Sequence, residues 1–145
     1  MSQELAIKKE YQHLLHQQKN NIEDYIHLLQ QAAEAIESGD QEKIEYYTSL
    51  ERVFTDKISG SHRTIQQFAN MNSDANEDSE LLAFEGEITA LLEKALDINK
   101  QNRQLLKERM QNLKIKMAEV QKKIKAKGGY LSPTNDDPQF IDISS

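Results

Sequence analysis

Apolar residues recur at alternating spacings of four and three along most of the chain, which is the period of α-helices that pack along a seam. The first run lies within residues 3–38 and is interrupted once, by a glutamine. It predicts a long first helix whose seam positions are Tyr11, Leu15, Gln18, Ile22, Tyr25, Leu29, Ala32 and Ile36.

The sequence "SGD" at residues 38–40 predicts a tight reversal after this helix. Gly39 suits the left-handed conformation that ends a helix, and Asp40 suits the N-cap of the next one. A second helix is predicted over residues 41–70, before the polar, turn-rich segment "NMNSDANEDSE". Its apolar face comprises Ile44, Tyr47, Leu50, Phe54, Ile58, Ile65 and Phe68.

A third helix is predicted over residues 79–127, because this range contains no proline, and two consecutive glycines, Gly128 and Gly129, follow it. It contains two apolar frames that are offset from each other. The first comprises Leu81, Phe84, Ile88, Leu91, Ala95 and Ile98, and the second comprises Leu106, Met110, Leu113, Met117, Val120 and Ile124. Six consecutive polar residues, 99–104, separate them, and we place the change of frame within this polar stretch.

The pattern as a whole predicts an all-α fold: an elongated antiparallel hairpin plus a long third helix, in a coiled-coil-like three-helix assembly. Residues 1–127 are predicted to form one domain and residues 128–145 a flexible tail containing Pro133 and Pro138. Because the first two helices are each shorter than the third, we expect the hairpin to leave the C-terminal half of the third helix poorly covered.

Composition supports this interpretation, because helix-forming residues dominate and the 145 residues include five glycines and two prolines. The absence of cysteine excludes disulfides, thiolate metal sites and a cysteine nucleophile. The N-terminus lacks the apolar core of a signal peptide, and no window approaches the apolar length of a membrane span. We therefore expect a cytoplasmic protein.

Charge is distributed unevenly along the chain. Residues 1–99 hold 8 basic and 19 acidic residues, whereas residues 100–127 hold 10 basic and 2 acidic ones. Nucleic-acid binding is disfavoured, since the lysines are spread around the helix, arginine is scarce and Tyr130 is the only nearby aromatic residue. The simpler interpretation is that the positive charge complements the helix dipole and acidic neighbours.

Catalytic chemistry is not indicated. His13 and His16 share a helix face, but no second cluster at ligand spacing accompanies them, so neither a metal site nor a cofactor is predicted. No glycine-rich loop follows a strand, and no nucleophile has a plausible base, so we do not expect an enzyme. Met110 and Met117 suit either an adaptable binding surface or a packed core, and the sequence leaves both open.

The segment "INKQNRQLL" places Ile98, Asn99, Asn102, Leu105 and Leu106 at the spacing of a Leu-Asn-x-x-Asn-x-x-Leu-Leu pattern, and "KGGYLSP" and "FIDISS" follow it. In this combination the chain resembles the FlgN-type flagellar export chaperones. Members of that family are small all-helical cytoplasmic proteins with such a pattern in the C-terminal helix, a tyrosine in a glycine-containing loop, and a polar tail. The order of helices and the "SGDQEKIE" turn extend the similarity over the whole chain.

The resemblance implies that the chain binds hook-associated junction proteins through their C-terminal helical segments and delivers them to the cytoplasmic domain of the flagellar type III export gate. The export ATPase complex is a further implied partner. Tyr130 is the implied gate-docking residue, and the cargo-binding residues are Asn99, Asn102, Leu105, Leu106, Met110, Leu113, Met117 and Val120. A structural coiled-coil adaptor, whose C-terminal half pairs with its own copy, is the alternative.

Overall fold

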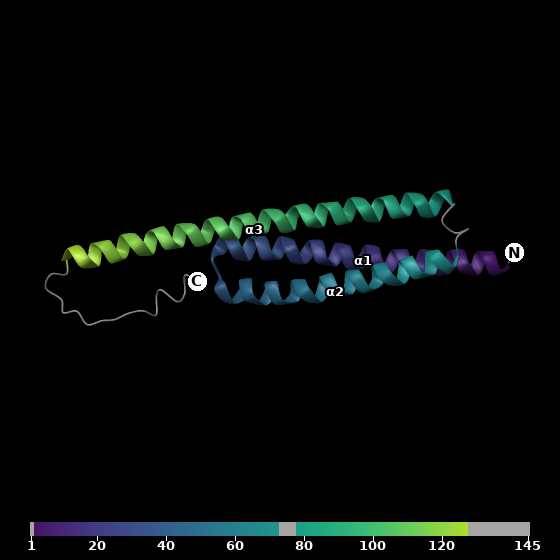
Figure 1. The fold of residues 1–145 in the computed structure, drawn as a ribbon, viewed down its shortest axis with the longest axis horizontal. Helices are drawn as coiled ribbons and strands as arrows, with labels where there is room; N and C mark the ends of the chain where they lie inside the picture. Colours follow the sequence, from purple (N-terminus) through teal and green to yellow (C-terminus); the bar gives the residue numbers. More distant parts are fainter. Residues whose placement is uncertain (1, 73–77, 128–145) are drawn as a thin grey trace. The chain divides into compact units, whose positions relative to one another are not determined.

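Three helices account for nearly all of residues 2–72 and 78–127, which are the residues that the computed structural model describes (Figure 1). They are α1 (Ser2–Ser38), α2 (Gln41–Met71) and α3 (Ser79–Lys127), and no strand occurs in these ranges. The all-α prediction is confirmed, with each helix boundary within one residue of its predicted position. The predicted tail, residues 128–145, lies outside the described residues.

The chain divides into two compact units, and α3 contributes to both. The bundle unit is Met1–Leu105, and the C-terminal unit is Leu106–Ser145, of which residues 106–127 are described. The predicted extent of a single domain, residues 1–127, stays a prediction.

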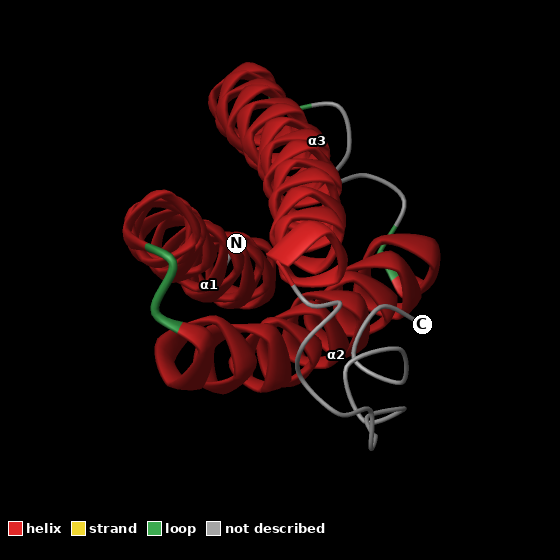
Figure 2. Cartoon of the chain, turned by 90° about the vertical axis from the view of Figure 1, so that its left-hand side faces the viewer, coloured by secondary structure: helices red, strands yellow, loops and turns green. Residues whose placement is uncertain are grey.

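A short reversal joins α1 to α2, drawn as the green loop in Figure 2. Gly39 has a φ of 73°, which a residue without a side chain adopts at little cost. The amide of Gly39 donates to the carbonyl of Ile36, and the amide of Asp40 donates to that of Ala35. The Asp40 side chain then accepts from the Lys43 amide at 3.2 Å and caps α2. Both predicted roles, for Gly39 and for Asp40, are confirmed.

The seam predicted for α1 is buried at all eight positions. This helix also buries Ile26, Leu28 and Ala35, which flank the seam. A helix that packs on one neighbour needs only a narrow apolar stripe, so the wider face indicates two neighbours. In the bundle unit these are α2, which runs antiparallel to α1, and the first part of α3 (Figure 1).

The bundle unit has two groups of buried apolar side chains. One surrounds Ile22, Leu29 and Ile58 and includes Ala95 of α3; the other joins Tyr11 and Leu15 to Ile65 and Leu81. Both groups draw on all three helices. Because Ala95 and Leu81 of α3 belong to these groups, the prediction that the hairpin packs on the front half of the third helix is confirmed. Each buried leucine or isoleucine contributes about 1.5–3 kcal/mol to the stability of this packing.

Polar contacts fix where α3 begins. Asp78 caps the helix, because its carboxylate accepts from the amides of Glu80 at 2.9 Å and Leu81 at 3.3 Å. Lys8 of α1 lies 3.1 Å from the Asp78 carboxylate and 3.2 Å from that of Glu80. The ammonium of Lys8 lowers the pKa of Asp78. One helix turn further on, the hydroxyl of Tyr11 donates to Glu85. These contacts join the N-terminal part of α1 to the start of α3.

Candidate functional site

The polar stretch of α3, residues 99–104, lies partly inside the bundle unit. Asn102 is 7% exposed, and its amide donates to the backbone carbonyl of Leu29 at 2.8 Å. The amide of Asn99 donates to the hydroxyl of Tyr25 at 2.9 Å. Asn102 occupies the next seam position of the first apolar frame, and Leu105 the one after it. The frame therefore continues through the polar stretch and changes only after Leu105, not within the stretch as predicted.

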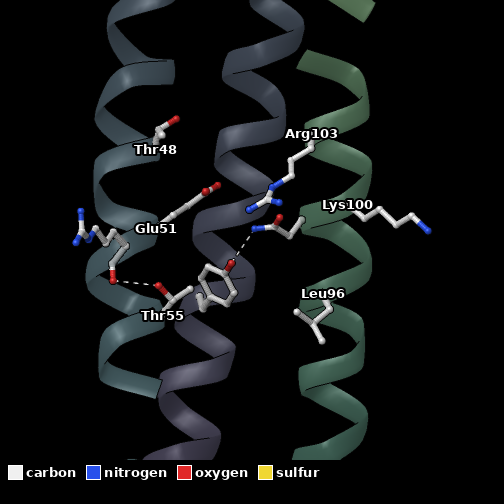
Figure 3. Close-up of a pocket in the computed structure, with 9 residues that line it drawn as sticks. Thr48, Glu51, Thr55, Leu96, Lys100 and Arg103 are labelled. Atoms are coloured by element: carbon white, nitrogen blue, oxygen red, sulfur yellow. Dashed lines mark hydrogen bonds between the residues drawn. The ribbon is translucent and has the colours of Figure 1, made fainter. Parts of the chain in front are cut away.

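A groove of about 550 Å³ lies between α2 and α3 beside this stretch (Figure 3). Tyr25 and Asn99 line it together with Glu51 of α2 and Arg103 of α3, which extend toward each other, whereas Lys100 points away. Burial raises the pKa of Glu51, and the nearby guanidinium of Arg103 opposes part of that rise. Burial also raises the pKa of Tyr25, so its hydroxyl stays protonated at neutral pH. The groove thus presents a mixed polar surface to solvent.

Gln18, the residue that interrupts the α1 seam, has a role in packing. It is 3% exposed, and its amide nitrogen donates to the backbone carbonyl of Ile58 in α2 at 3.1 Å. A buried polar side chain of this kind stabilises one alignment of two helices over others, because any shift leaves the amide without its partner. The bond of Gln18 thus favours the observed alignment of α1 with α2, and the bond of Asn102 to the Leu29 carbonyl favours that of α1 with α3.

The C-terminal unit presents a different surface, which we call the apolar row. Four of its members are large apolar side chains between 46% and 57% exposed, and two are half-buried. All six lie at alternating spacings of four and three on one face of α3. The members of the apolar row are Leu106, Met110, Leu113, Met117, Val120 and Ile124.

The predicted cargo residues therefore fall into two groups. Five of them are members of the apolar row: Leu106, Met110, Leu113, Met117 and Val120. Asn99 and Asn102 have partners inside the bundle unit, and Leu105 is half-buried on the seam of that unit. Tyr130 lies outside the described residues. That cargo contacts these residues stays a prediction.

Other chemistry is sparse among the described residues. No group of three or more histidines or carboxylates in residues 2–72 and 78–127 is placed to hold a metal ion. The ring of His16 packs edge-on against Phe84, with centroids 4.6 Å apart, while His13 is exposed. No described helix combines the length and the apolar character that crossing a bilayer requires.

Sequence reasoning missed the groove that Tyr25, Glu51 and Arg103 line together. A signal was present for Glu51, because it occupies a seam position between Tyr47 and Phe54 at the same spacing of four and three. The prediction chose the neighbouring Leu50 for that face. The partner of Asn99 was not predictable in this way, since a helix pattern does not specify which residue of another helix lies opposite.

Comparisons of the chain with protein-family models, with curated proteins and with solved structures give no match.

Proposed function

We propose that this protein is a cytoplasmic export chaperone of FlgN type, with no enzymatic activity. It holds hook-associated junction proteins by their C-terminal helical segments, prevents their premature assembly and delivers them to the flagellar type III export gate. The apolar row of α3 is the cargo surface. The proposal joins the resemblance of "INKQNRQLL" and its flanking motifs to the exposure of that row.

The exposure of the apolar row is the observation that carries the proposal. Single apolar side chains on a surface are ordinary, but six of them in a continuous heptad frame form a stripe that a second helix would cover. Leu113 and Val120 are 51% and 54% exposed. Burying the remaining apolar surface contributes about 25 cal/mol per Å², so a partner helix gains stability along the whole row.

An amphipathic segment that is unfolded until it binds is the partner that this geometry suits. Such a segment forms a helix on the apolar stripe and places its own anchors at the same spacing of four and three. Met110 and Met117 add unbranched, adaptable side chains to the row, which suits a surface that accepts more than one sequence. The methionines, which the sequence leaves open between core and surface, thus belong to the cargo surface in this proposal.

The test is calorimetry with a C-terminal segment of a hook-associated protein. Replacing Leu106 and Leu113 together by aspartate should abolish binding, because two charges would be buried without partners. The matched control is Ile115→Asp, since Ile115 is 58% exposed on the same helix but lies off the row. The control should bind like the wild type, and helicity by circular dichroism should be unchanged in both variants.

Unchanged binding by the Leu106→Asp, Leu113→Asp variant would exclude the row as the cargo site. A dimer that forms without cargo and dissociates on the same two substitutions would instead support the coiled-coil adaptor. Sedimentation equilibrium over a range of protein concentrations distinguishes these outcomes.

A second part of the proposal concerns Tyr130, which docks on the cytoplasmic domain of the export gate once cargo is held. Its support is the resemblance of "KGGYLSP" to the tyrosine-containing loop of the family, and an aromatic ring with a hydroxyl offers a large contact area at low entropic cost. Tyr130→Ala should leave cargo affinity and melting temperature unchanged but weaken gate binding severalfold. Equal gate affinity of the two proteins would remove this role.

A further inference from the structure

The residues that border the apolar row are almost all basic. In the heptad frame of the row, each seam position has one flanking position, and these positions alternate between the two sides of the row. Because residues 106–127 are helical throughout, these flanks follow directly from the sequence. All six are exposed, five are basic and none is acidic: Lys107, Arg109, Lys114, Lys116, Gln121 and Lys123.

The acidic residues of this segment lie elsewhere on the helix. Residues 106–127 contain two, Glu108 and Glu119, and neither occupies a flanking position. Both lie on the side of the helix that faces away from the row, which they share with Ile115 and Lys122. The positive charge is therefore concentrated beside the apolar stripe, where a bound helix would lie next to it.

We propose that the apolar row selects a partner helix whose own flanking positions are acidic, and that it rejects a second copy of itself. This inference rests on the proposed function and adds to it the chemical class of the cargo segment: an amphipathic helix with apolar anchors bordered by glutamate or aspartate. Complementary flanking charges set partner choice between two helices, whereas the apolar anchors supply most of the affinity.

Pairing of the row with its own copy is disfavoured in either orientation. In a parallel pair, each Arg109 would lie opposite the partner copy's residue 114, also a cation. In an antiparallel pair, the side that carries Arg109, Lys116 and Lys123 would face its own copy. Like charges opposite each other destabilise such a pair, and both orientations repeat the mismatch by symmetry.

A membrane surface fits the row less well than a helix does. Helices that lie on anionic lipid have a wide apolar face, usually with tryptophan or phenylalanine. The apolar row occupies only two positions per heptad and has no aromatic member, which is the width of a helix-to-helix seam. We therefore assign the basic flanks to an acidic helix.

Three designed helical peptides test the inference against the full chain. All carry leucine at the seam positions, and the flanking positions carry glutamate, glutamine or lysine. In calorimetry at low salt, the glutamate peptide should bind at least about tenfold more tightly than the glutamine peptide. The lysine peptide should not bind. The difference in affinity between the glutamate and glutamine peptides should shrink as the salt concentration is raised.

Charge reversal on the protein gives the complementary test. Lys114→Glu with Lys116→Glu changes one flank on each side of the row and leaves three basic and two acidic flanks, so the glutamate peptide should lose most of its advantage over the glutamine and lysine peptides. The matched control, Lys122→Glu with Lys125→Glu, changes net charge equally but alters no flanking position. It should keep the wild-type order of peptides.

Three results would overturn the inference: equal binding of the glutamate and glutamine peptides at low salt, a wild-type dimer in sedimentation equilibrium, or sedimentation of the protein with phosphatidylglycerol vesicles that the glutamate peptide does not displace.

Failure of the charge selectivity can be distinguished from failure of the proposed function. If hook-associated segments do not bind but the peptides behave as stated, the cargo assignment fails and the charge selectivity stands. If those segments bind through Leu106 and Leu113 but the charge reversal has no effect on any ligand, the selectivity alone fails.

Discussion

The two apolar frames of α3 have the same period but different borders. In the bundle unit, three residues beside the seam have individual partners in α1: Glu85 accepts from Tyr11, Asn99 donates to Tyr25, and Glu87 lies 3.6 Å from Lys19. Beside the apolar row the borders are basic on both sides. The comparison shows that an apolar period identifies a seam, while the residues next to it indicate which partner completes that seam.

The largest expected difference between the two regions is in the cost of removing an apolar side chain. Leu29 is 0% exposed in the bundle unit, so Leu29→Ala should lower the free energy of unfolding by about 2–5 kcal/mol. Leu113 is 51% exposed, so Leu113→Ala should lower it by less than about 0.5 kcal/mol. Urea denaturation followed by circular dichroism measures both values, and similar costs would show that the row is packed in solution.

A smaller effect is expected for the polar stretch. Asn102→Ala removes the hydrogen bond to the Leu29 carbonyl and leaves space in a buried layer, which should cost about 1–2 kcal/mol. Asn112→Ala is the control, because Asn112 is an exposed asparagine in the same helix. An Asn102→Ala protein as stable as the control would mean that the amide is not buried in solution.

The smallest effect concerns Glu51 and depends on pH. Since burial raises the pKa of its carboxyl above 4.5, the folded protein holds this proton more firmly than the unfolded chain does. The resulting stabilisation is present below the ordinary pKa and is lost as pH rises through the folded-state pKa. Glu51→Gln should therefore melt slightly above the wild type at neutral pH and equally with it under acid conditions. A difference that is the same at every pH would exclude this cause.

Much of the fold was predictable because its determinants are local. The period of apolar residues located all three helices, and the pair Gly39 and Asp40 located the reversal between the first two. The burial of Asn102 was not predicted, although its spacing continues the first frame, because a polar side chain is buried there only if another helix supplies a partner, here the carbonyl of Leu29. The members of the apolar row were also predictable. Its basic flanking positions were not recognised, because they can be identified only once the row is treated as a separate heptad frame that starts after Leu105.

Hydrogen exchange of the individual amides of α3 shows whether the apolar row stays uncovered until a partner helix binds. A helix with few tertiary contacts opens readily, so residues 106–124 in the free protein should exchange much faster than residues 81–102. Adding the glutamate-flanked peptide should slow exchange in residues 106–124 and leave residues 81–102 unchanged. Equal protection of the two segments in the free protein would mean that the row is already covered, and unchanged exchange in the presence of the peptide would mean that the row is not the binding surface.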